Sequence, residues 1–585
     1  MASTSNQPDK AQEKKHVILP LSRAAPDQVL NLRLILHFLA LVLPQIFIVL
    51  PARIFVTHVL LRWRSPIVRV IGRPALADYV SKLAQFILSR CHTAQVRIVF
   101  DRVRSYKLVQ SGPYFKGCRD WVTKVEVNGT AGRWIALPGT RREEDDVVLF
   151  FVHGGGFVVD TGSNAQDILL HVTKTLNLKK HTQASVFCLD YRLAPEYKYP
   201  SQLIETLAGY HYLVNTLGIS EDKIVIAGDS AGGNIATAFL LHLARPNPEI
   251  YVPEELGPTP KRPAGALLIS PFINLASRSA SSFANPDYDF IDLGGGFRAA
   301  CDYVGVYPPP GFRFPMPSYH PRWHFEFPHP HPPTDGRDLH TQWGWAHCEG
   351  IEKFNSPYVN PIVCQDADWW KEACPGDGKT VVTWGGKEIF ADDDEAFFKQ
   401  LEKSGVKPAK LVKKFGAHDW ILHDWSVPLA WKTKSKGPDK DFYFGMNAIV
   451  DLLSRIAKDA KESPSVKRAS LARSPSWASR PDVKAVSPES VKSSPSRTAG
   501  PALGPAPTPL ASKSSASAPA KPATGNDTYA ATASHDSLIP PDAPVLASGE
   551  GDILTRSTLG DSGVIVEKAG EKAKGQEKPK PKNRR

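Results

Sequence analysis

The middle of the chain, from about residue 120 to residue 460, alternates short apolar runs with longer amphipathic stretches. The apolar runs are rich in β-branched residues and lie at 145–153, 185–191, 223–228, 264–270, 379–385 and 410–416. Stretches of helical period separate these runs, and a last one covers 444–458. Strands that are apolar throughout and are joined by helices build a parallel sheet covered on both faces. The pattern therefore predicts an α/β fold with a mostly parallel central sheet.

A different pattern lies near the N-terminus, after a polar segment at 1–33. Residues 34–61 are apolar with few interruptions, and Pro44 marks a possible bend. A helix needs about 20 mostly apolar residues to cross the hydrocarbon core of a bilayer, so this segment predicts a single-pass membrane anchor. Arginines balance on its two sides, so its orientation stays open. The alternatives are a buried core helix and a helix that lies in the membrane plane.

The C-terminal part of the chain changes in composition. Residues 461–585 are rich in Ser, Pro, Ala and Lys and poor in residues that could form a core, so we expect a disordered tail. This tail holds 19 Lys and Arg against 12 Asp and Glu, and therefore more than half of the net charge of +12. No basic helix and no interleaving of aromatic and basic residues accompanies the charge, so the sequence predicts no nucleic-acid partner.

Seven cysteines are scattered over the 585 residues without any CxxC pair. This spacing indicates neither a disulfide framework nor a cysteine zinc site. His329 and His331 lie in a Pro-rich stretch without the ligand spacing of a helical or finger-type metal site. The sequence therefore predicts no metal.

Functional residues of parallel sheets gather beyond the carboxyl ends of the strands. The loop after the run at 223–228 reads GDSAGG, in which Gly228, Ser230 and Gly232 form the pattern GxSxG between a strand and a helix. The two glycines permit a turn tight enough to lift the serine off the sheet, as in a nucleophile elbow. Ser230 is therefore the candidate nucleophile.

Three glycines follow His153 at the end of an earlier strand. A serine that attacks a carbonyl group creates an oxyanion, and glycines let backbone N–H groups approach that charge without obstruction by Cβ. We expect Gly154, Gly155 and Gly156 to supply donors and the N–H of Ala231 to complete the oxyanion hole. His153 is interpreted as a residue that shapes this loop.

A catalytic serine needs a histidine base, and that histidine needs a carboxylate. In this type of fold the chain order is serine, acid, histidine. His418 follows the run at 410–416 and is the candidate base. Glu388 lies nearest to the end of the run at 379–385 and is the favoured acid, because Asp392 looks like part of the first turn of the next helix. Asp392 stays open as the alternative.

Two further segments are expected to cover the site. Residues 62–119 read as a helical cap or linker, and residues 285–355 form an insertion rich in aromatic residues and proline. An aromatic insertion beside an acyl pocket is typical of a lid, with a disordered insertion as the alternative.

Several linked motifs within 120–460 resemble those of the hormone-sensitive-lipase-like branch of the α/β-hydrolases. They are HGGGF at 153–157, DYRLAPE at 190–196, GDSAGG at 228–233, SPFINL at 270–275, SPYVNP at 356–361 and AHDW at 417–420. Together with an N-terminal anchor, this set is similar to arylacetamide deacetylases and fungal steryl deacetylases. Members commonly carry aspartate at the position of Glu388, and many carry glycine where this chain has Asp419.

The resemblance implies a serine carboxylester hydrolase of the esterase or deacetylase type, with Ser230, His418 and Glu388 as the catalytic residues. It also implies esters of hydrophobic alcohols as substrates, a location at the endoplasmic reticulum membrane, and no need for a metal or an organic cofactor. A long-chain lipase or a thioesterase is the nearest alternative. A non-catalytic ligand-binding protein or membrane scaffold is the alternative from another class.

Overall fold

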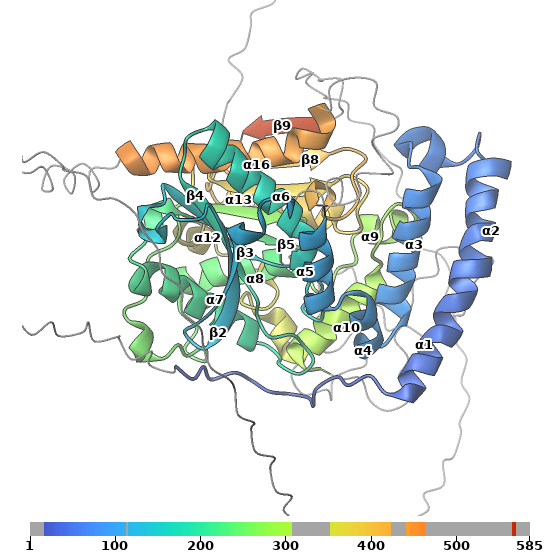
Figure 1. Cartoon of the computed structure of the whole chain (residues 1–585), viewed down its shortest axis with the longest axis horizontal. Helices are drawn as coiled ribbons and strands as arrows, with labels where there is room; N and C mark the ends of the chain where they lie inside the picture. The colour runs from blue at the N-terminus through green and yellow to red at the C-terminus, as the bar shows by residue number, and fades with distance from the viewer. Residues whose placement is uncertain (1–16, 113–114, 307–350, 423–439, 463–563, 569–585) are drawn as a thin grey trace, which may run out of the picture. The chain divides into compact units, whose positions relative to one another are not determined.

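The structure is a computed structural model that describes residues 17–112, 115–306, 351–422, 440–462 and 564–568. Within these residues one sheet has the strand order β1-β2-β4-β3-β5-β6-β7-β8-β9 (Figure 1). The strands are β1 Val122–Val127, β2 Thr130–Ala136, β3 Val147–Val152, β4 Ala184–Leu189, β5 Ile224–Asp229, β6 Gly265–Ile269, β7 Thr380–Gly385, β8 Ala409–Lys413 and β9 Val564–Lys568. The six strands from β4 to β8 in this order pair in parallel, as the hydrophobic pattern predicts.

Helices cover both faces of the sheet. They are α6 Gly162–Lys174, α7 Ser201–His211, α8 Ser230–Ala244, α12 Ala367–Ala373, α13 Ala391–Lys403 and α16 Lys440–Glu462. On β3, Val148 and Phe150 pack into one hydrophobic cluster with α7, α8, α12 and α13, while Leu149 and Phe151 pack into another with α6 and α16. Since successive side chains of a strand point to opposite faces, a strand buried on both faces must be apolar at every position.

The first two strands were not predicted. β1 and β2 form an antiparallel hairpin, and β2 also pairs antiparallel with β4. Thr123, Lys124 and Glu126 of β1 are polar and exposed, so this edge strand lacks the apolar run that marks the central strands. The turn at Asn128 and Gly129, with φ of +51° and +76°, is nevertheless a recognisable hairpin signal in the sequence.

One strand lies inside the segment predicted to be a disordered tail. β9 pairs antiparallel with β8, from Val564 opposite Lys413 to Lys568 opposite Ala409. Its sequence VIVEK is rich in β-branched residues, and an edge strand such as β8 offers unpaired backbone groups. For these residues the prediction of disorder is wrong, and the rest of the tail beyond Glu462 lies outside the described residues.

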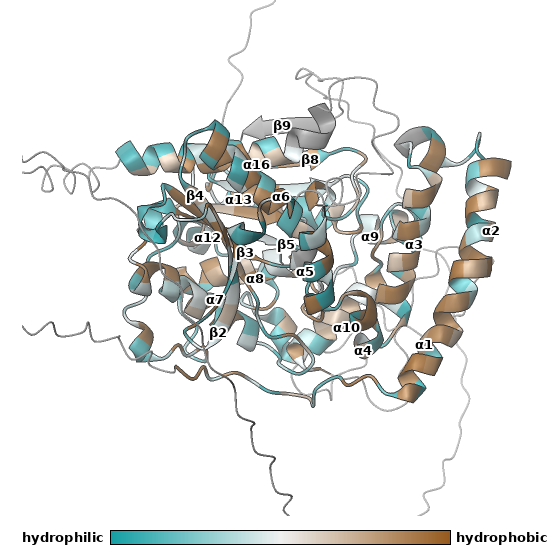
Figure 2. Cartoon of the chain, viewed as in Figure 1, coloured by the Kyte–Doolittle hydropathy of each residue, from teal (hydrophilic) through white to brown (hydrophobic). Residues whose placement is uncertain are grey.

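The N-terminal part is helical. A continuous helical run, Leu32–Leu60, consists of α1 Leu32–Pro44, a π-helical turn Gln45–Val49, α2 Leu50–Ile54 and a second π-helical turn Phe55–Leu60. By length and composition this run could cross a membrane, and Figure 2 shows that most of its residues are hydrophobic. The helices α3 Ala75–Arg90, α4 Thr93–Val99 and α5 Arg102–Ser111 follow within the predicted cap.

Only the ends of the predicted lid are described. The helix α9 Ala280–Ala284 precedes it, α10 Leu293–Val304 lies near its beginning, and a short 3-10 helix Ile351–Asn355 forms its end. The stretch 307–350, which contains His329 and His331, lies outside the described residues.

The close approach of α8 to the end of β3 gives a test of the fold. A Cβ atom at Gly232 would lie 2.0 Å from the carbonyl oxygen of Val152, whereas a Cβ atom at Gly296 would lie no closer than 3.6 Å to any ring atom of its neighbours. We expect Gly232→Ala to lower the free energy of unfolding by about 1–3 kcal/mol or more, as overpacking does. Gly296→Ala is the matched control in a helix and should not destabilise. Urea unfolding measures both, and equal stabilities would contradict the expected clash.

Candidate active site

Ser230 lies at a sharp turn between β5 and α8. Its φ is +50°, a left-handed conformation that is costly for a residue with a side chain. A Cβ atom at Gly228 would lie 2.3 Å from the carbonyl oxygen of Gly232, so the turn requires glycine there. The serine is mostly buried and lines a cavity. This is the geometry of a nucleophile elbow.

The glycine loop after β3 lies beside this turn. Gly155 and Gly156 have φ of +104° and +58°, which only glycine adopts without strain, and both line the same cavity as Ser230. The N–H of Gly154, however, donates to the Asp229 carboxylate at 2.9 Å. Its assignment as an oxyanion donor is therefore wrong, because the preceding residue of the elbow already uses that N–H. Gly155, Gly156 and Ala231 stay as the candidate donors.

His153 contacts both the glycine loop and Tyr191. Its Nδ1 lies 2.7 Å from the carbonyl oxygen of Gly154, and its ring stacks on Tyr191 with the centroids 4.1 Å apart. Burial lowers the pKa of His153 to about 4, so the imidazole is neutral at ordinary pH. These contacts agree with a role in shaping the loop.

His418 and Glu388 meet at the ends of β8 and β7. The Nδ1 atom of His418 lies 3.8 Å from Oε2 of Glu388, which is an ion-pair distance rather than a hydrogen-bond distance. The imidazole packs against the rings of Phe290 and Phe390, at centroid distances of 5.7 and 5.3 Å. His418 also lines the cavity that contains Ser230. The structure thus brings together all three residues that the sequence selects.

Asp392, the alternative acid, faces elsewhere. Its carboxylate accepts from the N–H of Ser281 at 2.7 Å, and its own N–H donates to the hydroxyl of Ser281 at 3.1 Å. Glu388 instead accepts from Ser270 Oγ at 2.8 Å and from the N–H of Gly385 at 3.1 Å. The geometry favours Glu388 over Asp392.

Two buried carboxyl groups beside the acid were not recognised in the sequence. Burial raises the pKa of Glu388 to about 8, and burial together with the Glu388 charge raises the pKa of Asp394 further. The two side chains interact, so the protonation of one depends on the protonation of the other.

Asp419 is the second of these residues. Its Oδ2 atom lies 3.3 Å from Nε2 of His418, and its N–H donates to Ser270 Oγ at 3.0 Å. The φ of Asp419 is +51°, a left-handed conformation that glycine adopts without strain. Burial raises the pKa of its carboxyl group well above the usual range. The His418 imidazole therefore contacts a carboxyl group on each side.

The cavity itself has a volume of about 670 Å³. Ser230 and His418 line one part of it, and apolar side chains of α3, α4 and α10 line the rest. Among these are Val80, Leu83, Val96, Val99 and Ala299. The site is thus a mainly apolar chamber with the candidate catalytic groups in its wall.

The family comparison agrees with this architecture. Residues 149–298 match the family model described as the alpha/beta hydrolase fold. The matched segment contains β3 to β6, the glycine loop and the elbow at Ser230. This chain contains an α/β-hydrolase domain.

Curated relatives match this domain over part of their length. An esterase of Acinetobacter venetianus is 31% identical over 165 residues, which are 27% of this chain and 48% of that protein. The human protein arylacetamide deacetylase-like 2 is 36% identical over 17% of this chain and 26% of its own length. Mouse hormone-sensitive lipase is 35% identical over 17% of this chain and 12% of its own length. The chain thus spans about half the length, or less, of the curated relatives it matches.

Solved structures were also compared. A crystal structure of an esterase from the bacterial hormone-sensitive lipase family covers 63% of this chain and 92% of its own. It has 22% sequence identity and a TM-score of 0.41. The assignment of the α/β-hydrolase domain rests on the sheet order and on the family match.

Asp289, between α9 and α10, is a further residue of the α/β-hydrolase domain that no motif indicated. Its Oδ1 accepts from the N–H of His418 at 3.1 Å, and its Oδ2 accepts from the N–H of Ile389 at 2.8 Å. One buried carboxylate thus ties the backbone of the candidate base to the residue that follows the candidate acid. Burial raises the pKa of Asp289 to about 6, while the backbone N–H groups oppose this shift.

The choice of acid leads to a direct test. We expect Glu388→Gln to slow labelling of Ser230 by a fluorophosphonate at least about 100-fold, because an amide cannot stabilise the imidazolium ion. Asp392→Asn should leave the rate within about threefold, since its partner is Ser281. The labelling reaction is stopped at timed intervals, and the mass of the intact protein gives the labelled fraction at each time. The two labelling rates follow from these fractions. The opposite ranking of the two variants would move the acid to Asp392.

The positioning role of Asp289 is tested by comparing its substitution in the presence and in the absence of His418. We expect Asp289→Asn to slow the same labelling by about tenfold or more, because an amide accepts from one N–H and repels the other. In the His418→Ala background the change should have no further effect on the rate.

The control for this test is Asp145→Asn. Asp145 is equally buried and accepts from Ser185 Oγ at 2.5 Å, but it lies before the amino end of β3, away from the site. It should change stability without changing the labelling rate of folded protein. A loss at Asp289 that is the same with and without His418 would contradict a positioning role.

Proposed function

We propose that the chain is a serine carboxylester hydrolase that acts by acyl transfer. The observation that carries the proposal is the convergence of an elbow serine, a glycine loop and a histidine next to a buried carboxylate on one apolar cavity. Ser230 is the nucleophile, His418 the base and Glu388 the acid. The names of the relatives, which include an esterase and lipases, support the same class.

The reaction then runs in two steps. His418 takes the proton of Ser230 Oγ as the oxygen attacks the ester carbonyl, and the N–H groups of Gly155, Gly156 and Ala231 stabilise the oxyanion. Protonation of the leaving oxygen by His418 releases the alcohol and leaves an acyl-enzyme. Water, deprotonated by His418, attacks the acyl carbonyl and releases the carboxylic acid, so that Ser230 regains its proton.

The cavity supports a hydrophobic ester as the substrate. Its wall beyond the catalytic groups is mostly apolar, and its volume of about 670 Å³ lies in the range of pockets that enclose a drug-sized ligand. An ester of a hydrophobic alcohol would bury its apolar part there. This burial would contribute about 25 cal/mol to the free energy of binding for each Å² of apolar area removed from water. A location at the endoplasmic reticulum membrane is part of the proposal and rests on the resemblance alone.

A long-chain lipase is the second candidate, because the same cavity could take an extended acyl chain. The two differ in which side of the ester fills the apolar chamber. An esterase of the deacetylase type places the alcohol there and prefers a short acyl group, while a lipase places the acyl chain there.

Hydrolysis of p-nitrophenyl esters from acetyl to palmitoyl tests both statements. We expect turnover by detergent-solubilised protein that falls as the acyl chain lengthens and that drops at least about 10³-fold in Ser230→Ala, because the nucleophile is lost. Turnover that peaks at long chains and still needs Ser230 would favour the lipase. Equal turnover by Ser230→Ala and the unaltered protein on every ester would overturn the proposed hydrolase.

A further inference from the structure

The helical run Leu32–Leu60, here called the N-terminal rod, is held by polar contacts to the cap helices along most of its length. Near its start, Gln95 of α4 donates to the carbonyl oxygen of Leu34 at 2.7 Å and lies 3.0 Å from Nδ1 of His37. In the middle, the Tyr79 hydroxyl of α3 donates to the carbonyl oxygen of Ile46 at 2.8 Å.

The contacts continue to the end of the rod. Arg53 forms an ion pair with Asp287 at 3.2 Å, and Nε2 of His58 lies 3.1 Å from the fully buried carboxylate of Asp78. Polar residues of the rod thus turn toward the hydrolase side of the molecule. The two π-helical turns each add a residue per turn, which helps to keep these residues on one face.

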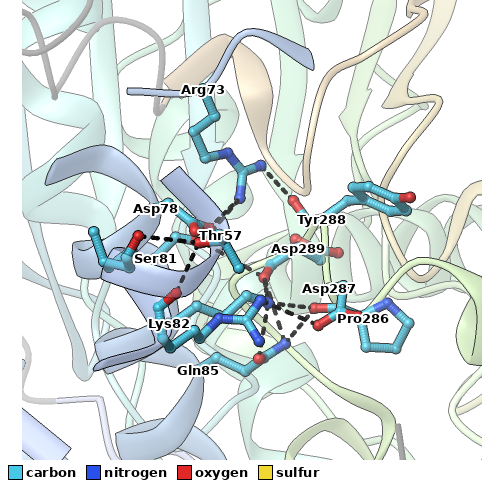
Figure 3. A network of polar contacts seen from close by, with 12 residues as sticks. Thr57, Arg73, Asp78, Ser81, Lys82, Gln85, Pro286, Asp287, Tyr288 and Asp289 are labelled. Carbon is cyan, nitrogen blue, oxygen red and sulfur yellow. Dashed lines mark hydrogen bonds and ion pairs between the residues drawn. The ribbon is translucent and has the colours of Figure 1, made fainter. Parts of the chain in front are cut away.

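The cap helix α3 is itself fastened to the α/β-hydrolase domain. Lys82 Nζ donates to the carbonyl oxygens of Pro286 and Asp289 at 2.5 and 3.0 Å, and Gln85 donates to the first of these oxygens at 2.9 Å. Figure 3 shows these side chains of α3 reaching the loop that holds Asp287 and Asp289. Burial lowers the pKa of Lys82 to about 7. The rod, α3 and the loop therefore form one packed unit.

This packing is incompatible with a rod that crosses a bilayer. The contacts reach from Leu34 to His58, which corresponds to about 36 Å of helix. The hydrocarbon core of a bilayer is about 30 Å thick. A spanning rod would therefore draw the contacts in its middle, Tyr79 on Ile46 and the ion pair of Arg53 with Asp287, into hydrocarbon, where charged side chains are expensive.

The face of the rod that turns away from the domain is apolar and exposed. In Figure 2, most residues along α1 and α2 have the brown colour of hydrophobic side chains. The large side chains on it that are at least half exposed are Leu32, Leu36, Phe47, Ile48, Phe55, Val59 and Leu60. Exposed apolar surface of this extent marks an interaction site.

The charges around this face favour lipid as the occupant. No acidic residue occurs from Gln28 to Ala77, and the exposed Arg62, Arg64 and Arg69 follow the rod. Trp63 is 60% exposed, and the Arg64 guanidinium lies 4.1 Å from the centroid of its ring. Exposed tryptophan and arginine next to an apolar helix face are typical of the region between lipid headgroups and acyl chains.

We propose that the N-terminal rod lies in the plane of a membrane surface, with its apolar face in the lipid and its polar face on the α/β-hydrolase domain, and that it does not span the bilayer. The rod's N-terminus and the hydrolase domain are then on the same side of the membrane. This topology does not depend on the ester hydrolysis proposed above.

Membrane binding by the N-terminal rod would also set the position of the cavity mouth. Val80 of α3 and Val99 of α4 both line the cavity and are each 47% exposed, so they rim its mouth. Both belong to the cap helices that hold the rod. A membrane-bound rod therefore brings the mouth near the lipid, where a hydrophobic ester dissolves.

The depth of single residues in the bilayer tests the proposal. Leu36→Cys, Phe47→Cys and Val59→Cys would each carry a fluorescent label on full-length protein bound to phosphatidylcholine and phosphatidylserine vesicles. The six cysteines within the described residues are all buried, and Cys348, outside them, is replaced by serine. Val103→Cys, 50% exposed on α5, is the solvent control. Lipids with spin labels near the headgroups or near the bilayer centre act as quenchers.

We expect the three rod positions to be quenched alike, and most strongly by the shallow spin label. Deepest quenching at Phe47 with shallow ends on both sides would indicate a spanning rod and overturn the proposal. No lipid quenching at any of the three positions would overturn it as well, and a dimer under those conditions would assign the apolar face to a second copy of the chain.

Two further measurements separate binding from topology. Phe47→Glu should weaken vesicle binding at least about tenfold, while Leu178→Glu, a change at an exposed apolar residue far from the rod in sequence, should not. Protease added to one side of sealed membranes should reach a tag at the N-terminus and the hydrolase domain together. Protection of one of the two would overturn the same-side topology.

Discussion

Parallel strands that are covered on both faces must all end at the same edge of the sheet, and the candidate site depends on this constraint. Ser230 follows β5, the glycine loop follows β3, and Glu388 and His418 follow β7 and β8. Residues far apart in the sequence thus meet at one edge of the sheet. The elbow completes the site because the left-handed Ser230 raises its hydroxyl above the strand ends.

The same edge collects buried carboxyl groups, which are costly unless they are protonated or hydrogen-bonded. Each of these carboxyl groups is stabilised in a different way. Asp289 accepts from backbone N–H groups, burial raises the pKa of Asp394 well above its usual range, and Asp229 accepts from the glycine loop. The hydrogen bonds to Asp289 and Asp229 also hold the backbone of the loops. The site is therefore positioned by its own electrostatic requirements rather than by hydrophobic packing alone.

The sequence predicts those parts of the structure that depend on local pattern. The central strands are apolar throughout, and the elbow and the glycine loop are short motifs, so the sequence alone selects Ser230, His418 and Glu388 as the candidate catalytic residues. Gly154 was misassigned because its N–H partner, the Asp229 side chain, becomes adjacent only in the fold. Asp289 escaped for the same reason, since its partners at Ile389 and His418 lie more than ninety residues away along the chain.

The cap helix α3 joins the two halves of the molecule that the sequence treats as separate. On one face its Tyr79 holds the N-terminal rod, and on another its Lys82 holds the carbonyl oxygen of Asp289. The carboxylate of that same Asp289 holds the N–H of His418. Two successive hydrogen-bonded contacts therefore separate the helix that carries the rod from the candidate base. The segment that the sequence predicts as a membrane anchor is thus linked through α3 to the backbone of the candidate base.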